Sequence, residues 1–298
     1  MSAVLRTPEA RFANLPDWPY APRYVDDLPG YAGLRMHYVD EGPQNRPVLL
    51  CLHGEPTWSY LYRRMIPVFL RSGARVVAPD FFGFGRSDKP ARDEAYTTEF
   101  HRKALIAFIQ RLRLADITLV VQDWGGLLGL TLPLAMPQRI ARLILMNTTL
   151  ATGEAPSKGF LAWRDFAARA PDMAVGQLIA RGTPHLTPAE IAAYDAPFPD
   201  QSYKAGVRRF PQLVPLSPDE PFAEMSRLAA QYWAKDWSGK TFMAVGMADP
   251  VLGPDVMQRL RAQIRGCPAP MEIPDGGHFV QEWGAPIAEA ALSAFAKA

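Results

Sequence analysis

Short runs of apolar residues recur along the chain, separated by stretches with helical periodicity. The runs rich in Val, Ile and Leu predict strands at 34–39, 47–52, 75–79, 117–122, 141–146, 240–246 and 269–273. Four of these runs are continuously hydrophobic rather than alternating. Continuous runs are typical of strands buried on both faces of a parallel sheet. The regular exchange of strands and helices therefore predicts an α/β open sheet with right-handed crossovers.

The stretches between the strands predict helices. Their expected ranges are 59–71, 98–113, 125–136, 221–234, 254–264 and 281–297. In the second of these, Phe100, Ala104 and Phe108 share one apolar stripe.

The alternation of strands and helices stops between residue 150 and about residue 220. This segment contains helix-like pieces at 158–170, 187–194 and 201–209, many prolines and no convincing strand. We interpret it as an insertion in the sheet domain. The predicted organisation is a core domain made of 1–149 and 221–298, with a helical cap domain at 150–220.

Composition narrows the class of protein. The chain has 298 residues, of which 48% are hydrophobic, and 32 basic against 30 acidic residues give a net charge of +2. This balance predicts neither a nucleic-acid partner nor a polybasic membrane patch. No apolar run reaches 18 residues, so no membrane span is expected. The N-terminal residues lack a signal-peptide pattern, which favours the cytoplasm.

The two cysteines, Cys51 and Cys267, have neither a CxxC partner nor a histidine at metal-ligand spacing. We therefore expect no structural metal site and no disulfide framework.

The most informative stretch is VVQDWGG, in which a buried strand ends at Gln122 and a glycine pair opens a helix. This order is typical of a nucleophile elbow, the sharp strand-to-helix turn of α/β-hydrolases. Gly125 and Gly126 would let the helix begin close to the strand. The nucleophile position carries Asp123, whose carboxylate can attack carbon and form an ester. The alternative is that Asp123 only caps the helix.

Residues 53–57 (HGEPT) directly follow the strand predicted at 47–52. In α/β-hydrolases this loop supplies one backbone N–H of the oxyanion hole, and the residue after the nucleophile supplies the other. A simple strand-to-helix turn is the alternative, since Gly and Pro mark turns generally. The position of the loop, upstream of the elbow and after an early strand, favours the oxyanion hole.

A general base is expected in the loop after the last strand, where DGGHF contains His278. That end of the sheet is where open α/β sheets bind ligands. The other four histidines lie in less suitable places, and they are His37, His53, His101 and His185. We expect His53 to shape its loop.

An acid that orients the base should lie between nucleophile and base, after a strand. Asp249 meets this condition, since it follows the strand at 240–246. Asp255 is the rival, but its position indicates the start of a helix. Asn147 also follows a strand, but an amide is not an acid.

The motifs taken together resemble those of bacterial haloalkane dehalogenases. The matching blocks span nearly the whole chain and lie at 53–69, 80–90, 120–126, 194–211 and 276–284. The combination of VVQDWGG with HGEP is highly specific. The resemblance implies an α/β-hydrolase fold with a mostly parallel eight-stranded sheet, flanking helices and a helical cap. It further implies no cofactor. We also expect no metal and a monomeric enzyme.

The resemblance also assigns the triad. Carried over by position, Asp123 is the nucleophile, His278 the base and Asp249 the acid that orients His278. Backbone N–H groups of Glu55 and Trp124 would form the oxyanion hole.

The resemblance points to two tryptophans for the leaving halide. Trp124 would donate its indole N–H, and Trp163, in the cap sequence GFLAW, would be the second donor. Position 55 is Glu where many relatives have a halide-binding Asn, and an ionised carboxylate cannot donate. The alternative for Trp163 is plain core packing. Other aromatic residues are expected in the core or the cavity wall, namely Phe81, Phe82, Phe160, Phe166, Phe198 and Phe210.

The expected reaction converts a small apolar haloalkane and water to a primary alcohol, a halide ion and a proton, through an ester on Asp123. An epoxide hydrolase is the nearest alternative, with Tyr194 or Tyr203 as candidate proton donors. A non-catalytic hydrolase-fold receptor is the alternative from another class. It would be favoured by a missing triad member, and none is missing.

Overall fold

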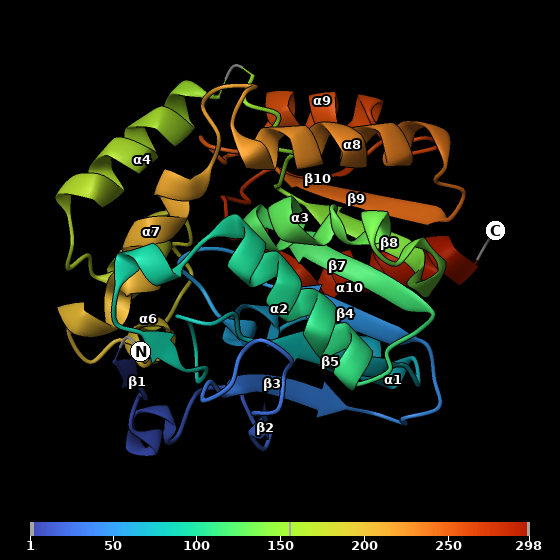
Figure 1. Ribbon diagram of the computed structural model, residues 1–298. Coiled ribbons are helices and arrows are strands. Elements are labelled where there is room, and N and C mark those ends of the chain that lie inside the picture. Colours follow the sequence, from blue (N-terminus) through green and yellow to red (C-terminus); the bar gives the residue numbers. More distant parts are fainter. Residues whose placement is uncertain (1–2, 155, 297–298) are drawn as a thin grey trace.

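The computed structural model describes residues 3–154 and 156–296, and its centre is an eight-stranded sheet (Figure 1). The spatial order of the strands is β10-β9-β8-β7-β4-β5-β3-β2. Their bounds are β2 Arg23–Val25, β3 Met36–Glu41, β4 Val48–Leu52, β5 Arg75–Pro79, β7 Ile117–Gln122, β8 Ile140–Met146, β9 Lys240–Gly246 and β10 Met271–Ile273. All neighbouring pairs are parallel except β3 with β5 and β2 with β3. The predicted mostly parallel α/β sheet is confirmed.

The strand predictions hold best at the centre of the sheet. β5, β7 and β9 have the predicted bounds, and β4 and β7 are buried along their full length. β2 was not predicted from the sequence. It has three residues at the edge of the sheet, and only Val25 of them is buried, so it carries no apolar run. The short antiparallel pair β1 (Val4–Leu5) and β6 (Lys89–Pro90) was missed as well.

Helices cover both faces of the sheet (Figure 1). They are α1 Ile66–Arg71, α2 Thr98–Arg111, α3 Asp123–Gly129, α8 Pro221–Lys235, α9 Pro254–Ala262 and α10 Gly284–Ala296.

Three of the predicted helices are divided or cut short, and α2 and α9 each end two residues before the predicted end. The stretch 59–71 divides into a 3-10 turn at Ser59–Tyr62 and α1, and 281–297 divides into a 3-10 turn at Val280–Trp283 and α10. The stretch 125–136 is helical only to Gly129. A proline lies within four residues of each break, and these prolines are Pro67, Pro286 and Pro133. Proline has no N–H for the carbonyl four residues earlier, so a helix tends to begin or end there.

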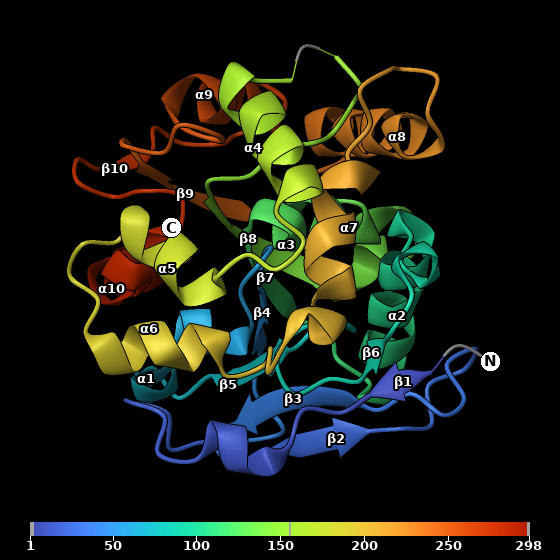
Figure 2. The ribbon, with the colours of Figure 1, turned by 90° about the vertical axis from the view of Figure 1, so that its left-hand side faces the viewer.

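The segment between β8 and α8 contains α4 Lys158–Arg169, α5 Val175–Arg181, α6 Pro188–Asp195 and α7 Ala205–Leu213. α5 was not predicted. Figure 2 shows these four helices in front of the sheet, over the carboxyl ends of the parallel strands. α6 begins with a capping box, in which Thr187 and Glu190 satisfy each other's backbone N–H groups.

A buried ion network attaches α6 to the core. The Arg63 guanidinium donates to both Glu282 carboxylate oxygens over 2.6 and 2.7 Å and to Glu190 Oε1 over 2.8 Å. The Tyr194 hydroxyl adds a hydrogen bond to Glu282 Oε1. Breaking a buried pair of this kind leaves an uncompensated charge, so each partner is held strongly in place.

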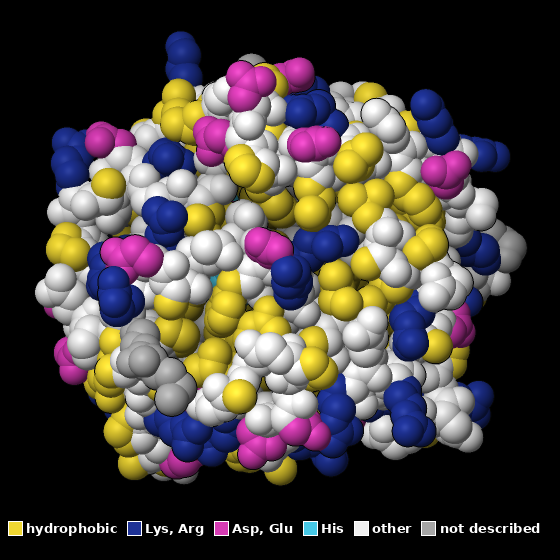
Figure 3. All heavy atoms as spheres, in the orientation of Figure 1, with side chains coloured by type: hydrophobic (Ala, Val, Ile, Leu, Met, Phe, Trp, Pro, Cys, Tyr) yellow, Lys and Arg dark blue, Asp and Glu magenta, His cyan; other side chains and the backbone are white. Residues whose placement is uncertain are grey.

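Charges of both signs are interspersed on the face drawn in Figure 3. Among the described helices, none has the length and hydropathy needed to cross a membrane.

Candidate active site

The turn between β7 and α3 has the geometry of a nucleophile elbow. Asp123 adopts a φ of +47°, in the left-handed region that side chains other than glycine rarely occupy. A Cβ on Gly125 would collide with the backbone carbonyl of Leu52, and one on Gly126 would collide with Thr148. The glycine pair is therefore required for the close approach of the helix to the strands. Strained backbone of this kind is concentrated at functional sites.

Hydrogen bonds fix the elbow in this conformation. Asp123 N donates to Asn147 O over 3.0 Å, and Thr148 Oγ1 donates to Asp123 O over 2.8 Å. The carboxylate of Asp123 does not cap α3. The N-cap position is Gln122, and no side chain caps the helix there. The capping interpretation of Asp123 is therefore wrong.

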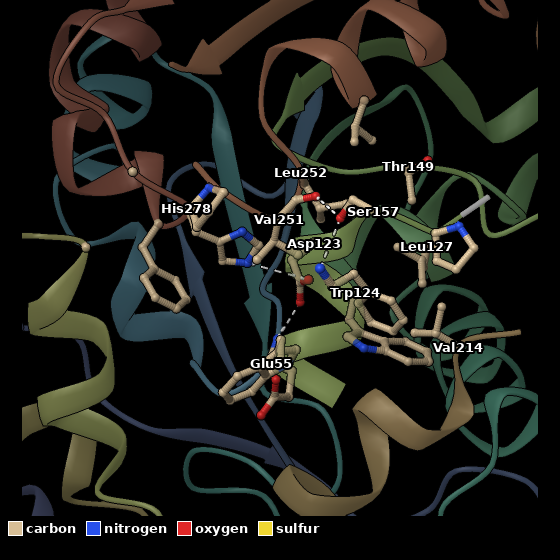
Figure 4. A pocket seen from close by; sticks show the side chains of 18 of the residues that line it. Glu55, Asp123, Trp124, Leu127, Thr149, Ser157, Val214, Val251, Leu252 and His278 are labelled. Atoms are coloured by element: carbon tan, nitrogen blue, oxygen red, sulfur yellow. Dashed lines mark hydrogen bonds and ion pairs between the residues drawn. The ribbon is translucent and has the colours of Figure 1, made fainter. Parts of the chain in front are cut away.

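The loop after β4 turns a backbone donor toward the nucleophile. Glu55 N donates to Asp123 Oδ1 over 2.8 Å, a contact drawn in Figure 4. His53 shapes this loop as predicted. Its Nδ1 lies 2.8 Å from Gly54 O, and its Nε2 accepts from Phe81 N over 2.9 Å. Burial lowers the pKa of His53, which keeps the ring neutral.

His278 lies between Asp123 and Asp249. Figure 4 shows its ring facing the carboxylate of Asp123. Its Nε2 is 3.6 Å from Asp123 Oδ2, and its Nδ1 is 2.9 Å from Asp249 Oδ2. Burial would lower the pKa of His278, but the charge of Asp249 and hydrogen bonds to both aspartates raise it well above its usual range. Burial would likewise raise the pKa of Asp249, but the positive charge and hydrogen bond of His278 lower it. Each of the two groups therefore stabilises the charged form of the other.

Asp249 is buried and receives two further hydrogen bonds. Val251 N donates to Oδ1 and Asn147 Nδ2 donates to Oδ2, each over 2.8 Å. Asp255 lies exposed in the first turn of α9, as the helix-start interpretation predicts.

Two supporting residues were not found from the sequence. Asn147 was considered only as a rival to the acid, whereas it is a partner of the acid. Gln122 Nε2 donates to the backbone oxygen of His278 over 3.0 Å and lies 3.1 Å from His278 Nε2. One pattern in the sequence could have indicated both residues. Each is a polar residue at the end of an apolar strand, since Gln122 ends β7 and Asn147 directly follows β8.

The three remaining histidines have other environments. His37 Nδ1 lies 2.7 Å from Asp80 Oδ2, and burial lowers the pKa of His101 to about 3. His185 is exposed and packs against Trp283, with ring centroids 4.6 Å apart.

A cavity of about 1090 Å³ opens above Asp123, between the strand ends and the segment that contains α4 and α5. Trp124 and Trp163 both line it, as does Glu55. Much of its remaining wall is aliphatic or aromatic, with contributions from Leu127, Phe160, Leu178, Val214, Val251 and Leu252. Such a wall favours a small apolar substrate. In the described part of the chain, no group of three or more His, Cys, Asp or Glu side chains is placed to hold a metal ion.

Comparison with known proteins agrees with this geometry. The family model for the alpha/beta hydrolase fold matches residues 47–285. A haloalkane dehalogenase from Psychrobacter cryohalolentis is 46% identical over 94% of this chain and 93% of its own length. Haloalkane dehalogenase 1 of Mycobacterium tuberculosis is 47% identical over 97% of this chain and 98% of its own length. The solved structure of a haloalkane dehalogenase from Paraglaciecola agarilytica has a TM-score of 0.97 and 51% identity, covering 99% of this chain and 100% of that one.

This chain belongs to the haloalkane dehalogenases.

The dehalogenase is a hydrolase that acts on carbon–halogen bonds in haloalkanes. The epoxide hydrolase alternative loses its candidate proton donors. The Tyr194 hydroxyl is buried and donates to Glu282. Neither Tyr194 nor Tyr203 is among the described residues that line the cavity. The receptor alternative is not supported, since the relatives are enzymes by name.

The aromatic residues of the dehalogenase divide into three groups. Phe160 lines the cavity, and Trp163 is a half-buried cavity residue rather than fully buried core. The rest of the predicted set is core, namely Phe81, Phe82, Phe198 and Phe210. The prediction for Phe166 is wrong. That side chain is 38% exposed and packs against Trp163, with ring centroids 5.7 Å apart.

Proposed function

We propose that Asp123 is the nucleophile that opens the carbon–halogen bond. The observation that carries this proposal is the placement of its carboxylate, held by Glu55 N–H on one oxygen and facing His278 Nε2 with the other, at the floor of an apolar cavity. In-line attack of this carboxylate on the substrate carbon expels halide and forms an alkyl ester. The leaving halide is a weak base, so this step needs no general acid.

Trp124 and Trp163 are proposed as the donors to the leaving halide. An indole N–H can donate but not accept, which suits an anion. Trp124 is fixed by Phe210, with ring centroids 4.4 Å apart, and it follows the nucleophile directly. Trp163 comes from α4, on the other side of the cavity. The two indoles therefore approach the cavity from the core and from the cap.

His278 is proposed as the base of the second step. It takes a proton from the water that attacks the ester carbonyl of Asp123, while the backbone N–H groups of Glu55 and Trp124 stabilise the oxyanion. Asp249 keeps the proton of the resting ring on Nδ1 and stabilises the imidazolium that forms. Collapse of the tetrahedral intermediate breaks the bond between the Asp123 carboxyl carbon and the alkoxide, and the protonated His278 gives the alkoxide its proton, which releases the alcohol. The regenerated carboxyl group of Asp123 loses its proton to solvent.

Substitution of the base tests this division of roles. His278→Ala should leave alkylation intact and block hydrolysis, so bromobutane should release about one bromide per active site and then stop. Intact mass spectrometry should show the protein heavier by one butyl group, located on the peptide that contains Asp123. His185→Ala is the matched control, because His185 lines the same cavity and is exposed. Multiple turnovers by His278→Ala at the wild-type rate would refute the assignment.

Residues 150–220 are proposed as the cap domain of this enzyme, with 1–149 and 221–298 as its core. The support is that α4 and α5 line the cavity while the triad comes from the core. The monomer expected from the sequence stays a prediction. The relative from Paraglaciecola agarilytica is described as tetrameric, and sedimentation velocity distinguishes the two states. Location in the cytoplasm and the absence of a cofactor also stay predictions.

A further inference from the structure

Gln122 makes two contacts with the proposed base that the proposed reaction does not use. It is the last residue of β7, directly before Asp123, and its side chain is buried. Its amide nitrogen donates to the backbone oxygen of His278 over 3.0 Å and lies 3.1 Å from Nε2 of the same residue. The amide oxygen accepts from Gln281 Nε2 over 3.4 Å. One buried amide therefore contacts both the main chain and the ring of His278.

The backbone contact fixes the direction in which this amide points. A carbonyl oxygen can only accept, so the group of Gln122 that faces His278 O must be the NH₂ group. The second hydrogen of that group is then available to Nε2. A nitrogen that accepts this hydrogen must carry its lone pair. The resting ring therefore carries its proton on Nδ1, which lies 2.9 Å from Asp249 Oδ2.

Asp249 and Gln122 act on the ring in opposite ways. The carboxylate of Asp249 accepts the Nδ1 proton in the neutral and the charged ring alike, and its negative charge favours the charged ring. The Gln122 N–H can bond to Nε2 only while that nitrogen is unprotonated, so it stabilises the neutral ring alone. The bond to His278 O does not depend on the ring proton and keeps the amide in place after proton transfer.

The charged groups around His278 act differently from this amide. The carboxylate of Asp123, 3.6 Å from Nε2, favours the charged ring. Glu55 lies on the cavity wall, and burial raises its pKa well above the usual range, so its carboxyl group adds little charge. The other charged or titratable residues of that wall, apart from the triad, are exposed, namely Glu154, Arg181, His185, Arg259 and Asp275.

We propose that Gln122 is a positioning residue of the base, which donates to Nε2 of His278 and so holds the resting ring neutral, with its lone pair on the side of Asp123. This inference rests on the proposed role of His278 as the base of the second step. It predicts that loss of the amide makes the ring easier to protonate and moves the pH range of ester hydrolysis. A side chain that only fills space would not have this effect.

Gln122→Met tests the proposal, because it keeps the length of the side chain and removes both donors. NMR titration of isotope-labelled histidine measures the pKa of His278 in the wild type and the variant. Loss of one hydrogen bond to the neutral ring should raise this pKa by about 0.5–1 pH unit. Gln281→Met is the matched control, because Gln281 is equally buried and contacts the same amide from the other side. In the control the pKa should stay at the wild-type value.

The rate of ester hydrolysis gives a second readout. Below the wild-type pKa, single-turnover hydrolysis of the butyl ester should be roughly 3- to 10-fold slower in Gln122→Met, because less of the ring is neutral. The difference should narrow as the pH rises above the pKa of the variant. An unchanged pKa of His278, with the same loss of rate at every pH, would overturn the proposal, because it is the result expected of packing alone.

The wild type provides a test that does not depend on a stable variant. In the neutral ring, the nitrogen chemical shifts of His278 should identify Nε2 as the unprotonated atom and Nδ1 as the protonated one. A proton on Nε2 of the neutral ring would overturn the proposal, since Gln122 could not then donate to that atom.

A failure of the underlying base assignment looks different. In that case Gln122→Met would still raise the pKa of His278 measured by NMR, but the pH dependence of ester hydrolysis would not follow it.

Discussion

Asn147 Nδ2 donates a hydrogen bond of 2.8 Å to Asp249 Oδ2. The same carboxylate oxygen lies 2.9 Å from His278 Nδ1, so one atom joins the amide at the end of β8 to the base. Asn147 is fixed in turn by Gly246, whose backbone N–H donates to Oδ1 over 2.8 Å and whose carbonyl accepts from Nδ2 over 3.1 Å. The acid is thus oriented by two neighbouring strands.

Removal of this amide should destabilise the protein and slow the second chemical step. Asn147→Ala deletes three buried hydrogen bonds, one of them to a charged group, which we expect to lower the free energy of unfolding by roughly 2–4 kcal/mol. The pKa of Asp249 should rise, because one donor to its carboxylate is lost. Urea denaturation measures the stability, and Asn45→Ala, on the exposed surface, is the control. Equal stability of the two variants would contradict the structural role of Asn147.

Substitution of the nucleophile should remove turnover while keeping the fold. Asp123→Asn replaces the attacking carboxylate by an amide, a poor nucleophile, but its oxygen can still accept from Glu55 N. We expect halide release from bromobutane to fall to the level of the protein-free solution. Slow deamidation would restore an aspartate, so fresh protein must be used and its mass verified. Wild-type activity in a preparation confirmed as Asn would refute the role of Asp123.

The features that the sequence predicts well are local ones. The elbow at Asp123 follows from adjacent residues, since an apolar strand, one carboxylate and two glycines stand next to one another. The central strands follow from continuous apolar runs. β2 was missed because an edge strand of three residues carries no such run, and the three shortened helices are interrupted by prolines within expected helical stretches.

The features that the sequence does not predict depend on contacts between distant segments. Asn147 could not be distinguished from a rival acid until the fold placed it against Asp249. The environment of Glu55 is a similar case, because the Asp123 carboxylate that accepts from Glu55 N comes from another part of the chain. From the residue type alone, the side chain of Glu55 was considered only as an ionised carboxylate, which cannot donate to a halide. Its burial in the folded chain changes that expectation.

The two chemical steps should respond differently to pH. Ester hydrolysis needs neutral His278, and its pKa is raised well above its usual range, mainly by Asp249 against the effect of burial. Below that pKa, the hydrolysis rate should therefore rise with pH, by about tenfold per pH unit. Alkylation does not need the base and should stay nearly constant over the same window.

The alkyl ester also removes the negative charge of Asp123, which contributes to the raised pKa of His278. The pKa seen in the hydrolysis step should therefore lie below that of the free enzyme. Single-turnover rapid-quench measurements separate the two steps, and NMR titration of the His278 ring gives the free-enzyme value. If both steps showed the same dependence on pH, His278 would not be the base of the second step alone.

The indole of Trp163 should contribute measurably to halide binding and to halide departure. Trp163→Phe keeps an aromatic ring and removes the N–H. The loss of one hydrogen bond to a charged group costs about 1.5–3 kcal/mol, so bromide affinity and the alkylation rate should each fall by roughly 10- to 150-fold. Trp283→Phe is the matched control, because Trp283 lines the same cavity but packs against His185.

Bromide should change tryptophan fluorescence saturably in the wild type and in Trp283→Phe. The chain contains seven tryptophans, so a titration with a salt that does not bind is needed to subtract collisional quenching. If Trp163→Phe retained both the affinity and the rate of the wild type, Trp163 would serve only in packing, and the second donor to the halide would have to come from another residue of the cavity wall.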